Sequence, residues 1–136
     1  EVNGRWQPVP GWTLDAHYAY ADARLSAPGA TLDGLRPAQS ARHMGGVTLG
    51  WTPAEGWRGF VSARYTGAQF EDDLNQTRMP GAWTVNTGVS APLTHGLTAS
   101  LSAENLYDSR LITRDSGGSI DLGPPRTFWL SLTFGE

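Results

Sequence analysis

Hydrophobic and polar side chains alternate with a period of two in six stretches of this chain, which is the pattern of half-buried β-strands. In the stretch 12–20, even-numbered positions are apolar or aromatic and odd-numbered positions are polar or small. The six stretches are 12–20, 47–51, 59–65, 83–91, 97–103 and 128–134, and a shorter piece at 2–7 looks like the end of one further strand. The pattern predicts about seven strands, most of them long enough to cross a bilayer at about 9–11 residues each.

The breaks between these strands alternate in length. Short breaks fall at 8–11, 53–56 and 92–96, and long ones at 26–40, 69–81 and 107–123. Outer-membrane barrels have tight turns on the periplasmic side and long loops outside, whereas a soluble sandwich has no reason to sort its loops in this way. The alternation favours an all-β fold: an antiparallel up-and-down meander of about seven strands, the C-terminal portion of a large transmembrane β-barrel.

Aromatic residues stand near both ends of the predicted strands. Trp6 and Trp12 flank the first short turn, Trp51 and Trp57 flank the second, and Tyr20 and Tyr65 lie at the opposite ends of two strands. Eight residues at about 3.3 Å each, tilted by about 40°, rise about 20 Å, close to the apolar band of about 25 Å between aromatic girdles. We therefore expect these six side chains to form the membrane girdle.

The same parity predicts which face each side chain occupies. The positions expected to face lipid are Leu14, Tyr18, Leu49, Val61, Val89, Leu101 and Leu130, and those expected to face the concave side are Thr48, Arg64, Asn86 and Ser102. If the last strand runs toward the periplasm, a chain with an odd number of strands must begin on the outer side of the membrane. Because bacterial single-chain barrels have an even number of strands, we expect a piece of a larger barrel, and a first residue other than Met points the same way.

Composition adds mainly exclusions. The 136 residues include 17 Gly and 9 Pro, and the longest stretch without either is 97–116, which leaves a helical bundle almost no room. No window approaches about 20 consecutive apolar residues, which excludes a helical membrane span. The absence of Cys excludes disulfides and thiolate metal sites. A net charge of −3 leaves no basic footprint, so we expect no nucleic-acid partner.

Several segments resemble motifs of TonB-dependent outer-membrane receptors. Residues 104–108 (ENLYD) resemble the signature before their last outer loop, and residues 123–128 (GPPRTF) resemble the start of their final strand. Residues 34–43 (GLRPAQSARH) resemble their approach to an inward strand, and 64–67 (RYTG) with 70–75 (FEDDLN) are similar to their R-Y-x-G…D-x-x-N segment. In this order the motifs span nearly the whole chain.

The resemblance implies that residues 1–136 are a C-terminal fragment of a receptor β-barrel domain in the bacterial outer membrane, with the plug and earlier strands lying upstream. It implies import of a scarce ligand, such as a ferric siderophore or vitamin B12. The energy would come from TonB and the inner-membrane energy complex through the plug, and no enzyme activity is expected. The barrel-assembly machinery would recognise the alternating C-terminal run Phe128, Leu130, Leu132 and Phe134, and outer-membrane lipid would surround the strands.

No residue pattern indicates a catalytic centre, a resident metal or a cofactor. His17, His43 and His95 lack the spacing that holds two metal ligands on one face, so we interpret them as solvated or lumen-lining. Asp15 and His17 share a face, but no nucleophile turn accompanies them. The glycines at 45, 46 and 50 lie in a strand and do not precede a helix, so we expect them to relieve crowding against a plug rather than bind phosphate.

Charged and polar residues supply candidates for contact with the ligand or the plug. Glu71, Asp72, Asp73 and Asn75 carry enough oxygen atoms for Ca²⁺, although a solvated loop tip is the favoured interpretation. Asp15 and Glu104 have lumen parity, and such residues commonly meet water alone. The candidates for ligand or plug contact are Arg42, Arg58, Arg64, Asp72, Asp73 and Asn75.

Two other functions stay open at this point. One is a small soluble β-barrel or sandwich that binds a ligand in its interior. The other is an enzyme built on an outer-membrane barrel, which needs a nucleophile and a base that the sequence does not reveal.

Overall fold

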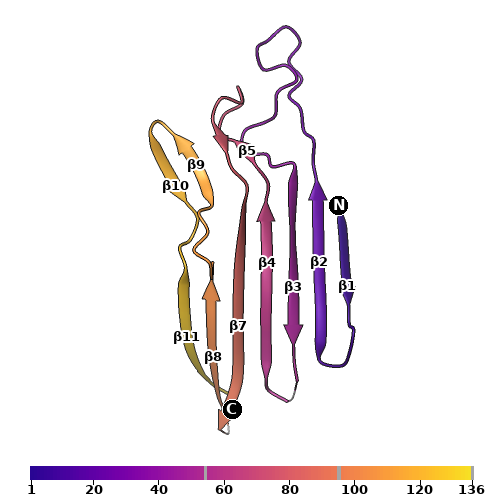
Figure 1. Cartoon of the computed structure of the whole chain (residues 1–136), viewed down its shortest axis with the longest axis vertical. Helices are drawn as coiled ribbons and strands as arrows, with labels where there is room; N and C mark the ends of the chain where they lie inside the picture. The colour runs from indigo at the N-terminus through magenta and orange to yellow at the C-terminus, as the bar shows by residue number, and fades with distance from the viewer. Residues whose placement is uncertain (54, 95, 136) are drawn as a thin grey trace.

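A seven-stranded antiparallel sheet dominates the computed structural model, which describes residues 1–53, 55–94 and 96–135 (Figure 1). The strands, in spatial order, are β1 (Val2–Trp6), β2 (Trp12–Tyr20), β3 (His43–Trp51), β4 (Arg58–Thr66), β7 (Ala82–Thr94), β8 (Leu97–Glu104) and β11 (Thr127–Phe134). Successive strands of the sheet pair antiparallel along its whole width, which confirms the predicted up-and-down meander. In the described part of the chain, no helix is long and apolar enough to cross a membrane.

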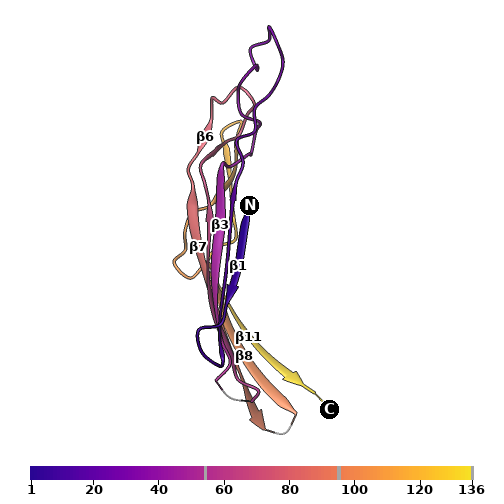
Figure 2. The same ribbon diagram turned by 90° about the vertical axis from the view of Figure 1, so that its right-hand side faces the viewer.

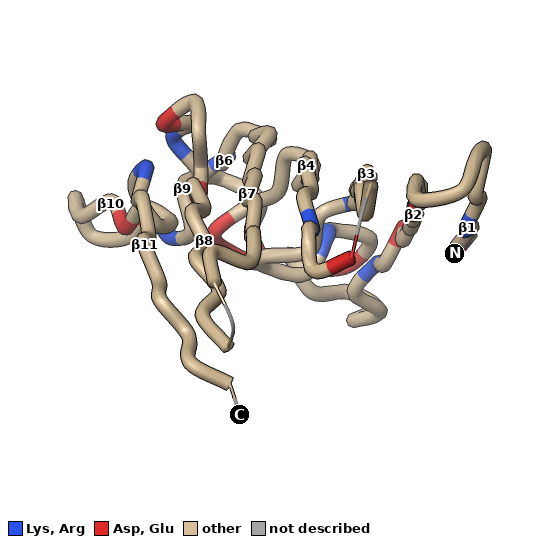
Figure 3. Tube along the Cα trace, turned by 90° about the horizontal axis from the view of Figure 1, so that it is seen from below, with Lys and Arg blue, Asp and Glu red and all other residues tan. Residues whose placement is uncertain are grey.

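The sheet is a single curved layer. Figure 2 shows it edge-on, and among the described residues no second sheet packs against either of its faces. Figure 3 views it along the strands, with β1 and β11 at opposite ends of the arc. Each of these two strands pairs on one side only within the described residues. This architecture differs from a sandwich, in which two sheets enclose a core.

Short and long connections lie at opposite ends of the sheet (Figure 1). The short ones cover positions 7–11, 52–57 and 95–96, and the long ones 21–42, 67–81 and 105–126. We call the end with the long connections the outer end and the opposite end the inner end, after the arrangement of outer-membrane barrels.

Two small hairpins stand inside the long connections, where the sequence pattern predicts loops. Strand β5 (Gln69–Phe70) pairs with β6 (Arg78–Met79), and β9 (Ile112–Ser116) pairs with β10 (Ser119–Leu122). Between β9 and β10, Gly117 and Gly118 have φ values of +61° and +82°, which fit a two-residue turn of type I′. The long break predicted over 107–123 therefore contains a hairpin that the alternation did not reveal, in which this Gly-Gly pair joins two short strands.

Strand β7 is longer than the alternation indicates. It continues through Pro92 to Thr94, so the predicted break at 92–96 begins too early. The pairing of β7 with β4 ends at Ser90, opposite Arg58, and the register with β8 shifts between Pro92 and Thr94. Proline is tolerated there because it occupies the irregular end of a strand, where one neighbour has already stopped.

The register confirms the predicted division of side chains between two faces. Residues directly opposite each other share a face. Leu14 lies opposite Leu49 and Leu49 opposite Val61, while Val89 lies opposite Leu101. We call the face that carries these residues the apolar face; Leu14 is half-buried on it, whereas Tyr18, Leu49, Val61, Val89, Leu101 and Leu130 are exposed. The opposite, polar face carries Thr48, Arg64, Asn86 and Ser102.

Close packing is concentrated at the outer end. The buried residues are Ala41, Gly67, Met79, Ala103 and Asn105, and Met79 has no exposed surface at all. Ala41 lies two residues before β3, Gly67 directly follows β4, and Met79 ends β6. Ala103 lies at the outer end of β8, and Asn105 directly follows that strand. The long connections therefore pack together instead of extending separately into solvent.

Candidate functional site

The first and second long connections are joined by a set of hydrogen bonds that we call the first clamp, between segments 36–39 and 70–77. The Asn75 side chain donates through Nδ2 to the Arg36 carbonyl oxygen at 2.8 Å and accepts through Oδ1 from the Arg36 N–H at 3.0 Å. Asp73 Oδ1 accepts from the Ala38 N–H at 2.7 Å, and the Gln39 N–H donates to the Phe70 carbonyl oxygen at 2.7 Å. Segment 36–39 is therefore held largely through its backbone.

Two residues of the first clamp adopt a backbone conformation that is rare outside glycine. Gln39 has φ +53° and Asn75 has φ +57°. Asparagine tolerates the left-handed region better than most residues because its side chain bonds locally. Here the Asn75 amide also donates to the carbonyl oxygen of Asp72 at 3.3 Å, so the unusual conformation aims the side chain at Arg36.

Asp72 closes the second loop upon itself. Its carboxylate accepts from the backbone N–H of Thr77 at 2.7 Å and from that of Gln76 at 3.1 Å. These bonds lower the pKa of the Asp72 carboxyl below its ordinary value, and the bond from Thr77 has the largest effect. The carboxylate therefore remains charged and bonded over the physiological pH range.

Glu71 connects the first clamp to the third long connection. Its carboxylate accepts from Gln39 Nε2 at 3.2 Å and lies 3.7 Å from Nε of Arg114 in β9. The Glu71 side chain is only 12% exposed, and β6 contacts β9 beside it. All three long connections are thus linked to one another.

The predicted Ca²⁺ alternative receives no support from this geometry. The oxygen atoms of Asp72, Asp73 and Asn75 serve separate backbone partners, and no group of three His, Cys, Asp or Glu residues in the described ranges could hold a metal ion. The favoured interpretation as a solvated loop tip was also incomplete, since Asp72 and Asn75 are half-buried. These side chains join two loops.

A second clamp joins the outer ends of β7, β8 and β11. Asn105 is 5% exposed with φ +46°. Its side chain accepts from the Ser109 N–H at 2.9 Å and donates to the carbonyl oxygens of Ser109 and Pro124, both at 3.0 Å. Its own N–H donates to Asn86 Oδ1 at 2.9 Å. The buried amide uses both its donor and its acceptor capacity, as a buried polar group must.

Asp108 extends the second clamp toward β11. Its Oδ1 accepts from the Arg126 N–H at 3.1 Å, and its φ is +53°. The four non-glycine residues with positive φ in the described part of the chain all belong to the two clamps. Backbone strain therefore gathers where the loops are fixed, which is typical of sites that hold a defined geometry. The pattern of charged residues does not point to Asn105; the signal in the sequence is the asparagine between strand and loop in the ENLYD motif.

Arg42, a predicted contact for ligand or plug, is engaged in an ion pair at the outer end of β3. Its Nε and Nη2 lie 2.8 and 2.7 Å from Asp22 Oδ1, and Arg24 Nε lies 3.3 Å from the same oxygen. Burial raises the pKa of Asp22, but the hydrogen bond from Arg42 and the charges of Arg24 and Arg42 outweigh it, and the net shift is downward. Arg42 fastens the first loop to β3.

The other predicted arginine contacts stand on the polar face. Arg58 lies opposite Ser90 and Arg64 opposite Thr84, and neither forms an ion pair with another described residue. Arg58 stands at the inner end of β4 and Arg64 near its outer end, and neither takes part in a hydrogen bond of either clamp. The structure therefore does not gather the six predicted contact residues into one pocket. Whether Arg58 and Arg64 meet a ligand or a plug stays a prediction.

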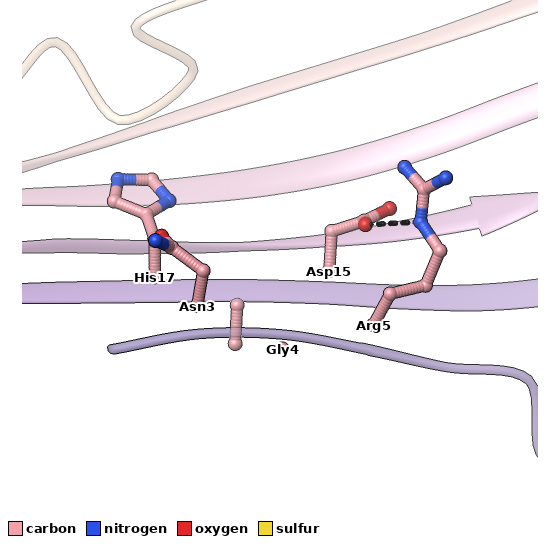
Figure 4. A pocket seen from close by; sticks show the side chains of 6 residues that line it. Asn3, Gly4, Arg5, Asp15 and His17 are labelled. Carbon is pink, nitrogen blue, oxygen red and sulfur yellow. Dashed lines mark hydrogen bonds and ion pairs between the residues drawn. The ribbon is translucent and has the colours of Figure 1, made fainter. Parts of the chain in front are cut away.

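A polar hollow lies on the polar face at the β1 edge (Figure 4). Arg5 and Asp15 face each other across β1 and β2, with Arg5 Nε 2.6 Å from Asp15 Oδ1, and Asn3 and His17 lie beside them. The Asp15–His17 pair therefore does not form a catalytic dyad, because the described Asp15 bond goes to Arg5.

Glycines on the polar face make room for neighbouring rings within the sheet. A Cβ on Gly46 would lie 2.7 Å from Cε1 of His17, and one on Gly88 would lie 2.7 Å from Cε1 of Phe60. The expectation that small residues relieve crowding holds for Gly46, but a ring of this same sheet fills the space. No plug is needed to explain it.

His43 occupies a different place from the predicted lumen. It lies opposite Tyr20 on the apolar face, its Nδ1 is 2.8 Å from the Tyr18 hydroxyl, and its ring centroid is 5.1 Å from that of Tyr20. Of the two interpretations offered for His43, solvated or lumen-lining, the second does not hold, because parity counted from Val47 and Leu49 puts this exposed residue on the apolar face. His95 lies outside the described residues.

The predicted girdle residues stand near the two ends of the strands. At the inner end, the rings of Trp12 and Trp51 pack with centroids 6.1 Å apart. At the outer end, the rings of Tyr65 and Trp83 pack with centroids 4.9 Å apart. Trp83 was not predicted as a girdle residue because its strand has no aromatic residue at the other end. Trp6, Trp57 and Tyr20 are exposed. Their role as a membrane girdle stays a prediction, as does that of Phe128, Leu130, Leu132 and Phe134 in assembly.

Comparison with known proteins identifies the family. Residues 1–106 match the family model described as "TonB dependent receptor-like, beta-barrel". The chain belongs to the TonB-dependent receptor β-barrel family. This membership confirms the resemblance on which the prediction rests, and the barrels of the family lie in the bacterial outer membrane, which is therefore the location of this chain.

Solved structures share the fold. The ferric yersiniabactin uptake receptor FyuA from Yersinia pestis has a TM-score of 0.85 at 19% identity, over 97% of this chain and 22% of the receptor. BauA, the ferric preacinetobactin receptor from Acinetobacter baumannii, scores 0.80 at 17% identity, over 97% of this chain and 21% of the receptor. The siderophore receptor PiuA from the same species scores 0.79 at 15% identity, over 96% and 20%.

The chain spans about a fifth of the length of these solved structures. Its sheet is therefore like one sector of a TonB-dependent receptor barrel. The two clamps coincide with the family-like motifs 34–43, 70–75, 104–108 and 123–128. Those motifs therefore have a physical role here, because they hold the long outer connections together and to the sheet.

Proposed function

We propose that the complete protein containing this chain is an outer-membrane receptor that binds a scarce ligand at its outer loops and imports it with energy delivered through TonB. Membership of the TonB-dependent receptor family over residues 1–106 carries this proposal. The ligand class we propose is a ferric siderophore, vitamin B12 or a similar chelated nutrient; the three structural neighbours named above are described as receptors for siderophores or their ferric complexes.

The geometry of the outer end supports a binding role. The first clamp and the Glu71–Arg114 contact join three loops to one another, and the first loop takes part through segment 36–39 near its base. Beyond the base, segment 25–35 of the first loop is closed by its own backbone bonds, from the Leu25 N–H to the Leu35 carbonyl oxygen at 2.8 Å and from the Gly34 N–H to the Leu25 carbonyl oxygen at 2.9 Å. Loops that are ordered before binding lose less conformational entropy when a ligand arrives.

The partners follow from the same proposal. TonB and the inner-membrane energy complex would act through a plug domain encoded upstream, together with the earlier strands of the barrel; residues 1–136 would then form the C-terminal part of the barrel domain. The barrel-assembly machinery would recognise the alternating run that ends at Phe134, and the apolar face would meet outer-membrane lipid.

The alternatives are less well supported. A soluble sandwich needs two sheets around a closed core, whereas the described residues form one layer with an exposed apolar face. The family and its structural neighbours are receptors and transporters rather than enzymes. We therefore assign no catalytic residue.

Uptake assays test the proposal. The gene is deleted, and cells are supplied with radioactive iron bound to a catecholate, a hydroxamate or citrate, or with radioactive cyanocobalamin. We expect deletion to abolish accumulation of one of these probes, a plasmid copy to restore it, and removal of TonB to abolish it again. Unchanged accumulation of all four probes would contradict the proposed ligand class, and TonB-independent uptake would contradict the energy source.

A further inference from the structure

The apolar face contains a groove of about 300 Å³ near the inner end of β2, β3 and β4. The outward-facing residues that line it are Trp12, Leu49, Trp51, Val61, Thr87 and Val89. Gly59 forms its floor: it lies opposite Trp51 on one side and Val89 on the other, and it contributes no side chain. The groove therefore exists because a glycine interrupts a row of large side chains.

The lining of the groove suits an apolar occupant. It contains no charged side chain, and the hydroxyl of Thr87 already donates to the Phe60 carbonyl oxygen at 2.8 Å. Val61 and Val89 are 50% and 41% exposed. Water in such a groove would find few hydrogen-bonding partners, and replacing it with a hydrocarbon chain is favourable at about 25 cal/mol per Å² of apolar surface.

The position of the groove defines which part of a lipid meets it. Trp12 is the first residue of β2 and Trp51 the last of β3, so the tryptophan pair stands beside the short inner turns. Tryptophan prefers the membrane–water interface because its ring is apolar and its N–H needs a polar partner. From there the groove extends toward Leu49 and Val61, into the hydrocarbon region.

We propose that this groove holds one acyl chain of a phospholipid from the inner leaflet, with the headgroup beside Trp12 and Trp51. The occupant is a lipid because the groove is continuous with the apolar face of an outer-membrane barrel sector. The inference deepens the proposed contact of the apolar face with outer-membrane lipid, on which it rests, by assigning one acyl chain to one groove. Transport of a ligand neither requires nor excludes it.

A pair of matched glycine variants tests the proposal in the complete outer-membrane protein. Gly59→Val places a side chain in the groove; its Cβ would lie 3.2 Å from Cε3 of Trp51, so the ring must yield slightly. Gly50→Val adds the same atoms on the polar face, opposite Phe60, where a Cβ makes only ordinary contacts. Each protein is extracted in mild detergent, its folding is checked by heat-modifiable gel mobility, and the retained phospholipids are counted by native mass spectrometry.

We expect the wild type and Gly50→Val to retain the same number of phospholipids and Gly59→Val to retain one fewer. Equal retention by all three proteins, or an equal loss in both variants, overturns the proposal. If Gly59→Val fails to fold, Val89→Phe fills the groove from its other side and is held to the same expectation.

Fluorescence quenching provides a second measurement on the folded protein. The emission of Trp51 is obtained as the difference between the wild type and Trp51→Phe. In vesicles of brominated phosphatidylcholine, this difference should be quenched by more than half relative to unbrominated vesicles. Emission from Trp51 that bromine leaves unchanged would overturn the proposal, even if the protein remained fully active in ligand uptake.

Discussion

The side-chain amide of Asn75 forms two hydrogen bonds with the backbone of Arg36, in the way that one strand pairs with another. The Asn75 amide donates to the Arg36 carbonyl oxygen and accepts from the Arg36 N–H, at 2.8 and 3.0 Å. Because the contact uses main-chain atoms of Arg36, its side chain is free to lie over the Phe70 ring, with Cζ 5.8 Å from the ring centroid. One side chain thus fixes the base of a loop that is distant in sequence.

Replacing Asn75 with alanine should loosen both loops. The substitution leaves the half-buried N–H and carbonyl of Arg36 without partners, at a cost of about 1–3 kcal/mol, and places alanine at a φ of +57°. We expect backbone amides in segments 36–39 and 70–77 to exchange with deuterium about tenfold faster or more. Asn3→Ala, an exposed change on β1, is the control. Faster exchange confined to segment 70–77 would show that the two loops are not coupled.

The second loop should open only in acid. The folded pKa of Asp72 is lowered, chiefly by the Thr77 N–H, so its contribution to stability is present above the ordinary carboxyl pKa of about 3.9. That contribution is lost as the pH falls through the lower pKa that Asp72 has in the folded protein. Limited proteolysis of the loop 67–81 should therefore be constant from neutral pH down to about pH 5 and rise below about pH 4. Asp72→Asn should cleave faster at neutral pH and lose this acid dependence; an unchanged profile would contradict the role of Asp72.

Sequence periodicity predicted the sheet but could not predict the clamps. The alternation around Leu49 and Val61 determines strands, faces and connection lengths because it reflects a regular backbone with a period of two. Asn75 and Arg36, in contrast, meet through irregular backbone with positive φ, and no period encodes such a contact. The resemblance to family motifs located the clamp residues, but charge alone led to an incomplete interpretation, a solvated loop tip with Ca²⁺ as the alternative.

The second clamp should depend more strongly on Asn105 than on its partner Asn86. Asn105→Ala removes three side-chain hydrogen bonds at a buried position, whereas Asn86→Ala removes only the acceptor for the Asn105 N–H. At about 1–3 kcal/mol for each buried group left unpaired, we expect folded protein to melt at a lower temperature in both variants, with the larger decrease for Asn105→Ala. The reverse order would mean that the Asn105 side chain is not the centre of the clamp.

Gly88 leaves room for the Phe60 ring, so a destabilising substitution at Gly88 should be compensated by a smaller residue at position 60. A Cβ at Gly88 would lie 2.7 Å from Phe60 Cε1 and 3.2 Å from Ser102 Cβ, and overpacking of this kind costs about 1–3 kcal/mol. Gly88→Ala should therefore lower the urea midpoint of unfolding, and adding Phe60→Leu should restore part of the loss. Gly4→Ala, where a Cβ meets nothing within 4 Å, should be neutral. If the double variant is no more stable than Gly88→Ala, the ring is not the obstacle.

Phe134 closes the apolar run of β11 at the inner end of the sheet. It lies opposite Leu97 and is 80% exposed in the open sheet. The free edge of β11 must pair with another strand in a closed barrel, because unpaired backbone groups facing lipid cost several kcal/mol each, and the family resemblance implies that the assembly machinery recognises this run. Phe134→Ala should therefore reduce the amount of folded receptor in the outer membrane, measured by heat-modifiable gel mobility. Ligand binding per folded molecule should remain unchanged, because the outer loops lie at the opposite end of the strands (Figure 1). Normal abundance with weakened binding would reverse the assigned direction of every strand.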